Sequence, residues 1–193
     1  MNKTRLIFLG PPGAGKGTQA KILADYLEVP HISTGEILRK AKQDGTPVGL
    51  KAKAYMDRGD LVPDIVLQEL VQERLQQEDA KTQGWILDGF PRTLPQAEFL
   101  ENLLPEINQE CDLIINLTVA DEILVERLAK RSALEGRSDD TEEVIRNRLV
   151  VYQQETAPLI DFYQKHLVTI DGDRSLDLIT NELKSVTKKD SGN

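Results

Sequence analysis

The residues best suited to chemistry form one stretch near the start of the chain, Gly10-Pro11-Pro12-Gly13-Ala14-Gly15-Lys16-Gly17-Thr18. A short apolar run precedes it and an amphipathic segment follows it, which predicts a buried strand, a glycine-rich turn and a helix. Glycines let consecutive backbone N–H groups curl around an anion, and the helix N-terminus adds partial positive charge there. Lys16 supplies a full charge for the outer phosphates. The spacing predicts a phosphate-binding loop whose hydroxyl is displaced by one position, to Thr18.

A second chemical signal is the stretch Trp85-Ile86-Leu87-Asp88-Gly89-Phe90-Pro91-Arg92, in which an apolar strand ends in a carboxylate and turns to an arginine. In a parallel sheet, Asp88 emerges at the same edge as the phosphate loop. A carboxylate there can hold Mg²⁺, directly or through its waters, and Arg92 offers a planar fork to a phosphate. Each residue alone could be a capping aspartate or a solvated arginine, but together they favour phosphoryl transfer.

A third signal is a group of arginines in one later stretch, Arg127, Arg131, Arg137, Arg146 and Arg148. Arg127 and Arg131 are four residues apart, so one face of a helix presents both. A single arginine here is adequately explained as a solvated charge, because Glu126, Glu142 and Glu143 stand nearby. As a group they can line a polyanion pocket, since phosphoryl transfer depends mostly on positioning and charge neutralisation.

These groups need a sheet whose strands end at one edge. Apolar runs predict five buried strands, at residues 6–9, 29–32, 85–87, 113–117 and 167–170. Helical patterns lie between them, including 63–78, 141–165 with Pro158 dividing it, and about 175–186. This alternation predicts an α/β fold, a doubly wound parallel five-stranded sheet with helices on both faces. The polar end of the chain, from about Ser185, is expected to be disordered.

The length of 193 residues predicts a single domain with one core, at 1–32, 63–130 and 141–193, and two inserts. Residues 33–62 are expected to form two short helices broken at Asp44-Gly45-Thr46-Pro47, and residues 131–140 a short polar connection. Both are candidates for lids that close over the binding edge and keep water out. For the short one, an ordinary surface connection is an equally good explanation.

The composition argues against several other classes of protein. A net charge of −8 is unfavourable for general nucleic-acid binding, which needs a broad basic surface. The single cysteine, Cys111, and the two histidines provide neither a disulfide nor a cysteine cluster for zinc. No apolar run reaches membrane-spanning length, and the first residues do not resemble a signal peptide. We therefore expect a cytoplasmic protein without nucleic-acid or membrane partners.

Taken together, the motifs resemble those of the adenylate kinase family, which are nucleoside monophosphate kinases. Gly10 to Thr18 matches the family's loop, including the displaced threonine, and Trp85 to Gln96 matches its Asp-Gly-Phe-Pro-Arg signature. Further matches lie at residues 33–39, 59–63, 156–159 and 171–172. The resemblance covers nearly the whole chain and implies the P-loop kinase fold, the reaction MgATP + AMP ⇌ 2 ADP, and a monomer.

The resemblance also implies roles for the matching residues. The expected ATP contacts are Gly13, Ala14, Gly15, Lys16, Gly17, Thr18, Arg127, Arg131 and Gly172, with Arg127 stacked on the adenine. The expected AMP contacts are Thr34, Arg39, Asp60, Leu61, Val62, Gly89, Phe90, Pro91, Arg92, Gln96, Arg137 and Arg148. The implied catalytic residues are Lys16, Arg92, Arg131, Arg137 and Arg148. Asp88 is expected to hold Mg²⁺ through water, with help from Glu36.

Two departures from relatives matter. The insert at 131–140 is far shorter than the lid of the long family form and has no cysteine, so zinc is not expected. Asp60 stands where some relatives have lysine. Thr34 and Gln96 favour AMP as the acceptor, because a hydroxyl and an amide can bond an adenine edge. Two alternatives stay open: a kinase for UMP or CMP, and a nucleotide-hydrolysing switch. An assay with MgATP and each monophosphate distinguishes all three.

Overall fold

A computed structural model describes residues 3–135 and 141–189 of the chain. One sheet organises it, with all strand pairs parallel and the order β2-β3-β1-β4-β5. The strands are β1 Thr4–Leu9, β2 His31–Ser33, β3 Gly84–Asp88, β4 Leu113–Thr118 and β5 Leu167–Asp171. The predicted doubly wound α/β fold is therefore confirmed.

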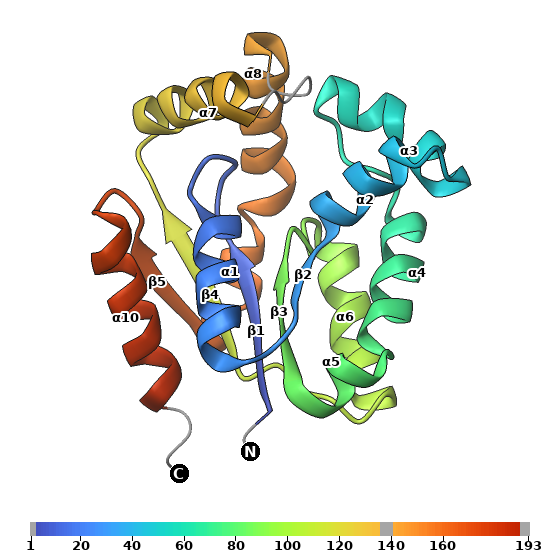
Figure 1. Cartoon of the computed structure of the whole chain (residues 1–193), viewed down its shortest axis with the longest axis vertical. Coiled ribbons are helices and arrows are strands. Elements are labelled where there is room, and N and C mark those ends of the chain that lie inside the picture. The colour runs from blue at the N-terminus through green and yellow to red at the C-terminus, as the bar shows by residue number, and fades with distance from the viewer. Residues whose placement is uncertain (1–2, 136–140, 190–193) are drawn as a thin grey trace.

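Helices connect the strands and cover both faces of the sheet (Figure 1). In chain order they are α1 Lys16–Leu27, α2 Thr34–Gln43, α3 Pro47–Arg58, α4 Asp64–Leu75, α5 Glu78–Gln83, α6 Leu94–Glu106, α7 Asp121–Glu135, α8 Glu142–Val151, the π-helix η1 Tyr152–Thr156, α9 Leu159–Phe162, the 3₁₀-helix η2 Gln164–His166 and α10 Leu176–Lys189. Across residues 3–135 and 141–189, none of these helices combines the length and apolar character needed to cross a membrane.

Alternating side chains of β1 divide the core into two layers. Ile7 and Leu9 face a cluster supplied by α4, α6 and α9, whereas Leu6 and Phe8 face one supplied by α1 and α10. This period of two is what a strand buried on both faces requires. Trp85, at the start of β3, is fully buried, and its indole N–H donates to Gln109 Oε1 at 2.7 Å.

The strand order creates a switch point between β1 and β3. The chain leaves β1 toward β2 on one side of the sheet and leaves β3 toward β4 on the other. Ligands of open α/β sheets bind at such a point, outside the carboxyl ends of the strands. The phosphate loop follows β1 and Asp88 ends β3, with Phe8 and Asp88 paired in register. Both chemical stretches therefore meet at this crevice.

Two groups of helices stand over the carboxyl ends of the strands. Figure 1 shows α2 and α3 on one side and α7 with the start of α8 on the other. The predicted break between α2 and α3 is confirmed: Thr46 accepts a hydrogen bond from Gly49 N at 3.2 Å and Pro47 opens α3. The second predicted insert is helical over its first residues, since α7 continues to Glu135. Its remainder, 136–140, lies outside the described residues.

Three other expectations need correction. The second strand begins at His31 because Glu28 has a left-handed conformation and Val29 N bonds Ala24 O at 3.1 Å, which closes α1. The helix predicted over 63–78 ends at Leu75, and α5 follows it. The helix predicted over 141–165 is divided as expected, although the π-helix starts at Tyr152, ahead of Pro158.

The predicted disorder from Ser185 is wrong for residues 185–189, which continue α10. Thr187 is only 4% exposed and its hydroxyl donates to Leu183 O at 3.0 Å. Leu183 is fully buried and Val186 packs against the same core cluster. Packing on the sheet therefore extends the helix beyond the point where the composition turns polar. Residues 190–193 lie outside the described part.

Candidate active site

The phosphate loop has the backbone that its glycines predict. Gly13 and Gly15 have φ angles of 87° and 91°, in the left-handed region that side-chain-bearing residues avoid. A Cβ on Gly13 would lie 3.0 Å from Leu128 Cγ and 3.2 Å from Leu124 O, so α7 leaves no room for one. The loop feeds directly into α1 at Lys16. Backbone N–H groups and the positive end of α1 thus face the same space.

A cavity of about 740 Å³ opens at this point and joins the chemical stretches. Its size suits a ligand larger than a single phosphate. The described residues that were predicted as site residues and line it are Gly13, Gly15, Lys16, Gly17, Thr18, Thr34, Arg39, Asp60, Leu61, Val62, Asp88, Gly89, Pro91, Arg92, Arg127, Arg131 and Arg148. Glu36 also lines it. The fold therefore gathers residues from six separate segments around one cavity.

Burial of cations gives the cavity its electrostatic character. Lys16 Nζ donates to the carbonyl oxygens of Gly10 and Pro11 at 2.8 and 2.9 Å. Burial lowers the pKa of Lys16 to about 8, against the charge of Asp88, which raises it. Burial and the neighbouring Arg148 lower the pKa of Arg92 to about 10. The lysines and arginines that line the cavity outnumber its carboxylates, Glu36, Asp60 and Asp88, so the cavity favours a polyanion.

Among the carboxylates that line this cavity, Asp88 stands at the end of β3, beside the phosphate loop. Its Oδ2 lies 3.8 Å from His31 Nε2, and a Cβ on Gly17 would lie 3.5 Å from the same oxygen. Carboxylate oxygen is the donor that Mg²⁺ prefers, and Mg²⁺ in phosphoryl-transfer sites takes its other ligands from phosphates and water. In the described residues, no group of three or more His, Cys, Asp or Glu side chains could hold a metal ion. A carboxylate beside a phosphate loop fits Mg²⁺ shared with a nucleotide.

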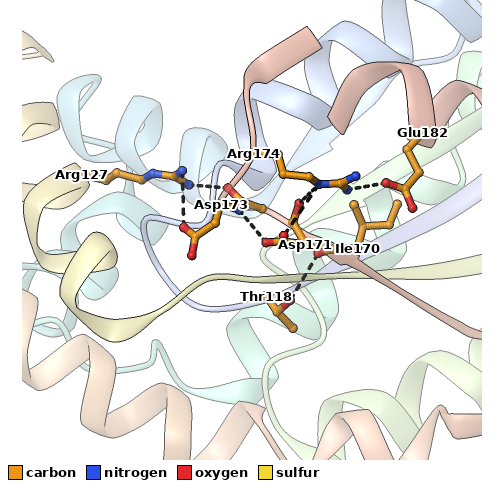
Figure 2. A network of polar contacts seen from close by, with 8 residues as sticks. Thr118, Arg127, Ile170, Asp171, Asp173, Arg174 and Glu182 are labelled. Carbon is orange, nitrogen blue, oxygen red and sulfur yellow. Dashed lines mark hydrogen bonds and ion pairs between the residues drawn. The ribbon is translucent and has the colours of Figure 1, made fainter. Parts of the chain in front are cut away.

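Arg127 is held by the turn between β5 and α10. Its Nη1 donates to Gly172 O at 2.9 Å, and its Nη2 lies 3.8 Å from Asp173 Oδ1 (Figure 2). Gly172 is buried, and its N–H donates to Thr118 O at 2.8 Å. Gly172 therefore lies behind Arg127 and does not line the cavity.

The turn itself is braced by polar contacts. Asp173 N–H donates to Asp171 Oδ1 at 2.9 Å, and Arg174 Nε donates to Asp171 O at 3.1 Å. Arg174 also pairs with Glu182 of α10, as Figure 2 shows. The bracing fixes the carbonyl that orients Arg127, a contact across 45 residues of sequence.

The other arginines divide into two groups. Arg131 and Arg148 line the cavity from α7 and α8. Arg146 does not: it pairs with Glu142 at 2.8 Å and its side chain is 75% exposed, as a solvated charge would be. Arg137 lies outside the described residues.

The residues expected to contact the AMP base are engaged with the protein. Thr34 lines the cavity, and its hydroxyl donates to Gly89 O at 2.9 Å, which leaves its oxygen as an acceptor. Gln96 is fully buried and does not line the cavity. Its Oε1 accepts from Arg92 N–H at 2.7 Å, and its Nε2 donates to Asp64 Oδ1 at 2.7 Å. The amide can meet a base only if the cavity wall in front of it shifts.

Ala14 and Phe90, also predicted as contacts, are buried and away from the cavity wall. Residues to which the sequence assigned no role of their own also line it, among them Leu38, Met56, Leu67, Lys130, Tyr152 and Thr156. Thr156 donates to Arg92 O at 2.8 Å, so the π-helix supports the arginine of the second stretch. A helical period places Leu38, Met56 and Leu67 inside the protein, but nothing in their spacing marks them as cavity residues.

Asn147 on α8, which the sequence did not single out, contacts the cavity residue Asp60. Its Nδ2 donates to Arg58 O and to Asp60 Oδ1, both at 2.9 Å. Together, Arg58 and Asn147 hold the pKa of Asp60 below its usual value. The Asp60 carboxylate thus has its own polar partners in this structure.

Comparison with known proteins places the chain in one family. The model of the family described as adenylate kinase matches residues 8–168. Adenylate kinase 1 of Nostoc sp. strain PCC 7120 is 59% identical over 184 residues, covering 94% of this chain and 97% of that protein. Adenylate kinase of Cyanothece sp. strain PCC 7425 is 54% identical over 190 residues, 97% of either chain. Adenylate kinase of Leptospira biflexa is 54% identical over 185 residues, 94% of this chain and 99% of that one. The resemblance seen in the motifs is thereby confirmed, and the chain belongs to the adenylate kinase family of phosphotransferases.

Proposed function

We propose that the protein transfers the terminal phosphoryl group of MgATP to AMP, reversibly, giving two ADP. The observation that carries this proposal is the one cavity in which the phosphate loop, Asp88 and the arginines of four separate segments meet. A site for two nucleotides must neutralise many phosphate charges at once, whereas a hydrolytic switch needs to hold only one nucleotide. The charge of this cavity therefore favours transfer between two polyanions.

On the ATP side, the backbone of residues 13–18 is proposed to bind the phosphates. Lys16 Nζ, now on the carbonyls of Gly10 and Pro11, would turn to the outer phosphates, which offer it a charged acceptor. Arg127 is proposed to stack on the adenine, presented by the turn that holds it. Arg131 lines the same cavity and would neutralise the transferring group.

Asp88 is proposed to hold Mg²⁺ through water, with Glu36 assisting. When held there, Mg²⁺ would supply positive charge that neutralises the phosphates. The protein's own contribution is to present the Asp88 carboxylate in the same cavity as Lys16, whose charge attracts it.

On the AMP side, Arg39, Arg92 and Arg148 are proposed to clamp the phosphate, as all three line the cavity. Arg92 is held at both ends of its backbone, through its N–H to Gln96 and its carbonyl to Thr156. A fixed arginine loses less freedom when it binds, so more of the interaction is available for orienting the acceptor. Leu61 and Val62 would form an apolar wall for the base.

The inserts at 33–62 and 131–140 are proposed to close over the cavity, because transfer to water must be excluded. Dyes placed on the two inserts should move closer when a bisubstrate analogue is added, and unchanged distances would refute closure. We further propose that the protein works as a monomer in the cytoplasm. These expectations rest on the family resemblance.

The decisive test is an assay of the purified protein with MgATP and AMP, CMP or UMP in turn. The proposal expects ADP from AMP, with kcat/KM for AMP roughly a hundredfold or more above that for CMP or UMP, since an unmatched pyrimidine leaves polar groups unpaired. Comparable values for AMP and CMP would favour a UMP/CMP kinase instead. Release of phosphate from ATP without any monophosphate, and no diphosphate from AMP, would favour a hydrolytic switch.

A further inference from the structure

The amide of Gln96 is fixed at both ends by partners that do not exchange roles. A backbone N–H, that of Arg92, can only donate, and it meets Gln96 Oε1 at 2.7 Å. An ionised carboxylate can only accept, and Asp64 Oδ1 meets Gln96 Nε2 at 2.7 Å. Gln96 is 0% exposed, so no water competes for either contact. The two contacts together determine which way the amide points.

A rotation of the amide by 180° would create two conflicts. It would set the NH₂ group against the Arg92 N–H and the amide oxygen against the Asp64 carboxylate, in a buried place where unpaired polar groups are costly. Asp64 is in turn placed by the fold. It opens α4 and its second oxygen accepts from Thr93 Oγ1 at 3.4 Å, while Thr93 caps α6 just before Gln96. The carboxylate is thus positioned by two helices.

The fixed amide has a consequence for the base that it meets. One lone pair of Oε1 and one N–H of Nε2 remain unused. Once the cavity wall in front of Gln96 has shifted, the amide therefore presents an acceptor and a donor in a set order. A 6-aminopurine presents a donor at its amino group and an acceptor at N1. A 6-oxopurine in the same pose presents the reverse, an acceptor at its oxygen and a donor at N1. An amide whose acceptor and donor match the 6-aminopurine edge therefore meets the 6-oxopurine edge with acceptor against acceptor and donor against donor.

We propose that Asp64 is a positioning residue that sets the acceptor's base specificity: by fixing the Gln96 amide, it selects 6-aminopurine monophosphates against 6-oxopurine monophosphates. Asp64 itself does not touch the substrate in this account, and the inference rests on the proposed AMP kinase function. It differs from simple shape selection, because adenine and hypoxanthine are nearly the same size. A carboxylate on another helix, 32 residues away in sequence, decides which is accepted.

The test compares AMP with inosine monophosphate as acceptors, with MgATP as donor. The asparagine introduced by Asp64→Asn could either accept from or donate to Gln96, so in this variant the amide is free to turn at that end. The ratio of kcat/KM for AMP over inosine monophosphate should fall by about tenfold or more, the range of one hydrogen bond to a charged group. Asp64→Ala, which removes the contact, should shift the ratio in the same direction. An unchanged ratio in both folded variants would overturn the proposal.

Glu78→Gln is the matched control. Glu78 also lies in the first turn of a helix, α5, and its loss removes a similar helix-end charge without contacting Gln96. If Asp64 had a purely structural role, its substitution would lower activity toward both acceptors equally. The ratio of kcat/KM for AMP over inosine monophosphate would then be the same in the Asp64 variants as in Glu78→Gln. That result would also overturn the proposal.

A measurement on the wild-type protein is independent of whether the variants fold. The side-chain NH₂ of Gln96, assigned by its loss in Gln96→Ala, should exchange slowly with solvent, and rapid exchange would overturn the fixed amide. Failure of the underlying function has a separate signature. Wild-type protein that makes no ADP from AMP and MgATP refutes the AMP kinase itself, whereas normal turnover of AMP with an unaltered ratio in the variants refutes only the role of Asp64.

Discussion

The two sides of the cavity, proposed to bind AMP and ATP, are built in different ways. On the AMP side, Gln96 is fully buried and held between a backbone donor and the carboxylate of Asp64. On the ATP side, Arg127 is held by a backbone carbonyl, and both it and Asp173 keep about a third of their side chains exposed, 34% and 31%. A fixed amide recognises the hydrogen-bonding edge of one base through its order of donor and acceptor, whereas a guanidinium plane stacks on any base. The difference indicates strict choice of acceptor and tolerant choice of donor.

The largest effect should come from Lys16, the cation of the phosphate loop. Lys16→Ala removes a charge aimed at the phosphates, and such donors are worth several kcal/mol in a transition state, so kcat should fall at least roughly a hundredfold. Steady-state kinetics of the variant, with its fold checked by circular dichroism, would measure this. Near-normal turnover in a folded variant would contradict the role assigned to Lys16.

The pH dependence of kcat/KM should give the next largest effect. It changes the charge of Lys16 while the side chain itself stays in place. The pKa of Lys16 is lowered to about 8, so the lysine is charged below that pH and neutral above it. The value of kcat/KM for ATP, which reports the free enzyme, should fall about tenfold by pH 9. A profile that stays flat to pH 9 would show that Lys16 keeps its charge.

The same shift affects stability in the opposite direction. In the unfolded chain the pKa of Lys16 returns to its ordinary value of 10.5, so between pH 8 and 10.5 the unfolded state binds more protons than the folded one. The contribution of Lys16 to the free energy of unfolding therefore rises with pH in this window. Comparing the pH dependence of unfolding with that of Lys16→Met would isolate it.

Gln96→Ala tests the AMP side directly. Without the amide, the base loses a donor and an acceptor, so the preference for AMP over CMP should narrow by about tenfold, while KM for ATP changes little. Equal losses with both monophosphates would mean that Gln96 serves only to hold Arg92. The side-chain contact with the Arg92 N–H makes that outcome a real alternative.

The smallest effect is expected on the ATP side. Arg174→Gln removes the ion pairs with Asp171 and Glu182 that brace the turn behind Arg127. Because these groups are partly exposed, the pairs are worth little, and KM for ATP should rise only about threefold, with KM for AMP unchanged. Glu182→Gln should reproduce the effect, since it breaks the same pair. A change in KM for AMP instead would contradict the proposal that this turn affects only the binding of ATP.

Local patterns predicted the sheet and the phosphate site well. The alternation of Leu6, Ile7, Phe8 and Leu9 between two core layers is visible in an unbroken apolar run, and Gly13 and Gly15 are required by left-handed backbone. Asp88 could be placed because a parallel sheet brings all carboxyl ends to one edge. These features depend on neighbours in sequence or on one rule of topology.

Contacts between distant segments were not predictable in the same way. Nothing near Gln96 indicates that Asp64 holds its amide, and nothing near Arg127 indicates Gly172 O as its partner. Arg146 looked like its cavity-lining neighbour Arg148 until the helix phase placed it toward solvent. The end of α10 was missed because tertiary burial of Thr187, and not local composition, keeps it helical.

The buried indole at the start of β3 has a practical consequence for spectroscopy. Trp85 is the sole tryptophan of the chain. It is fully buried in the core cluster that also holds Ile7 and Leu9, and its N–H donates to Gln109. Its emission should therefore be blue-shifted and should move to the red only when the sheet itself loses its packing. Intrinsic tryptophan fluorescence is thus a reporter of global unfolding, and a test of the proposed insert closure needs an added dye.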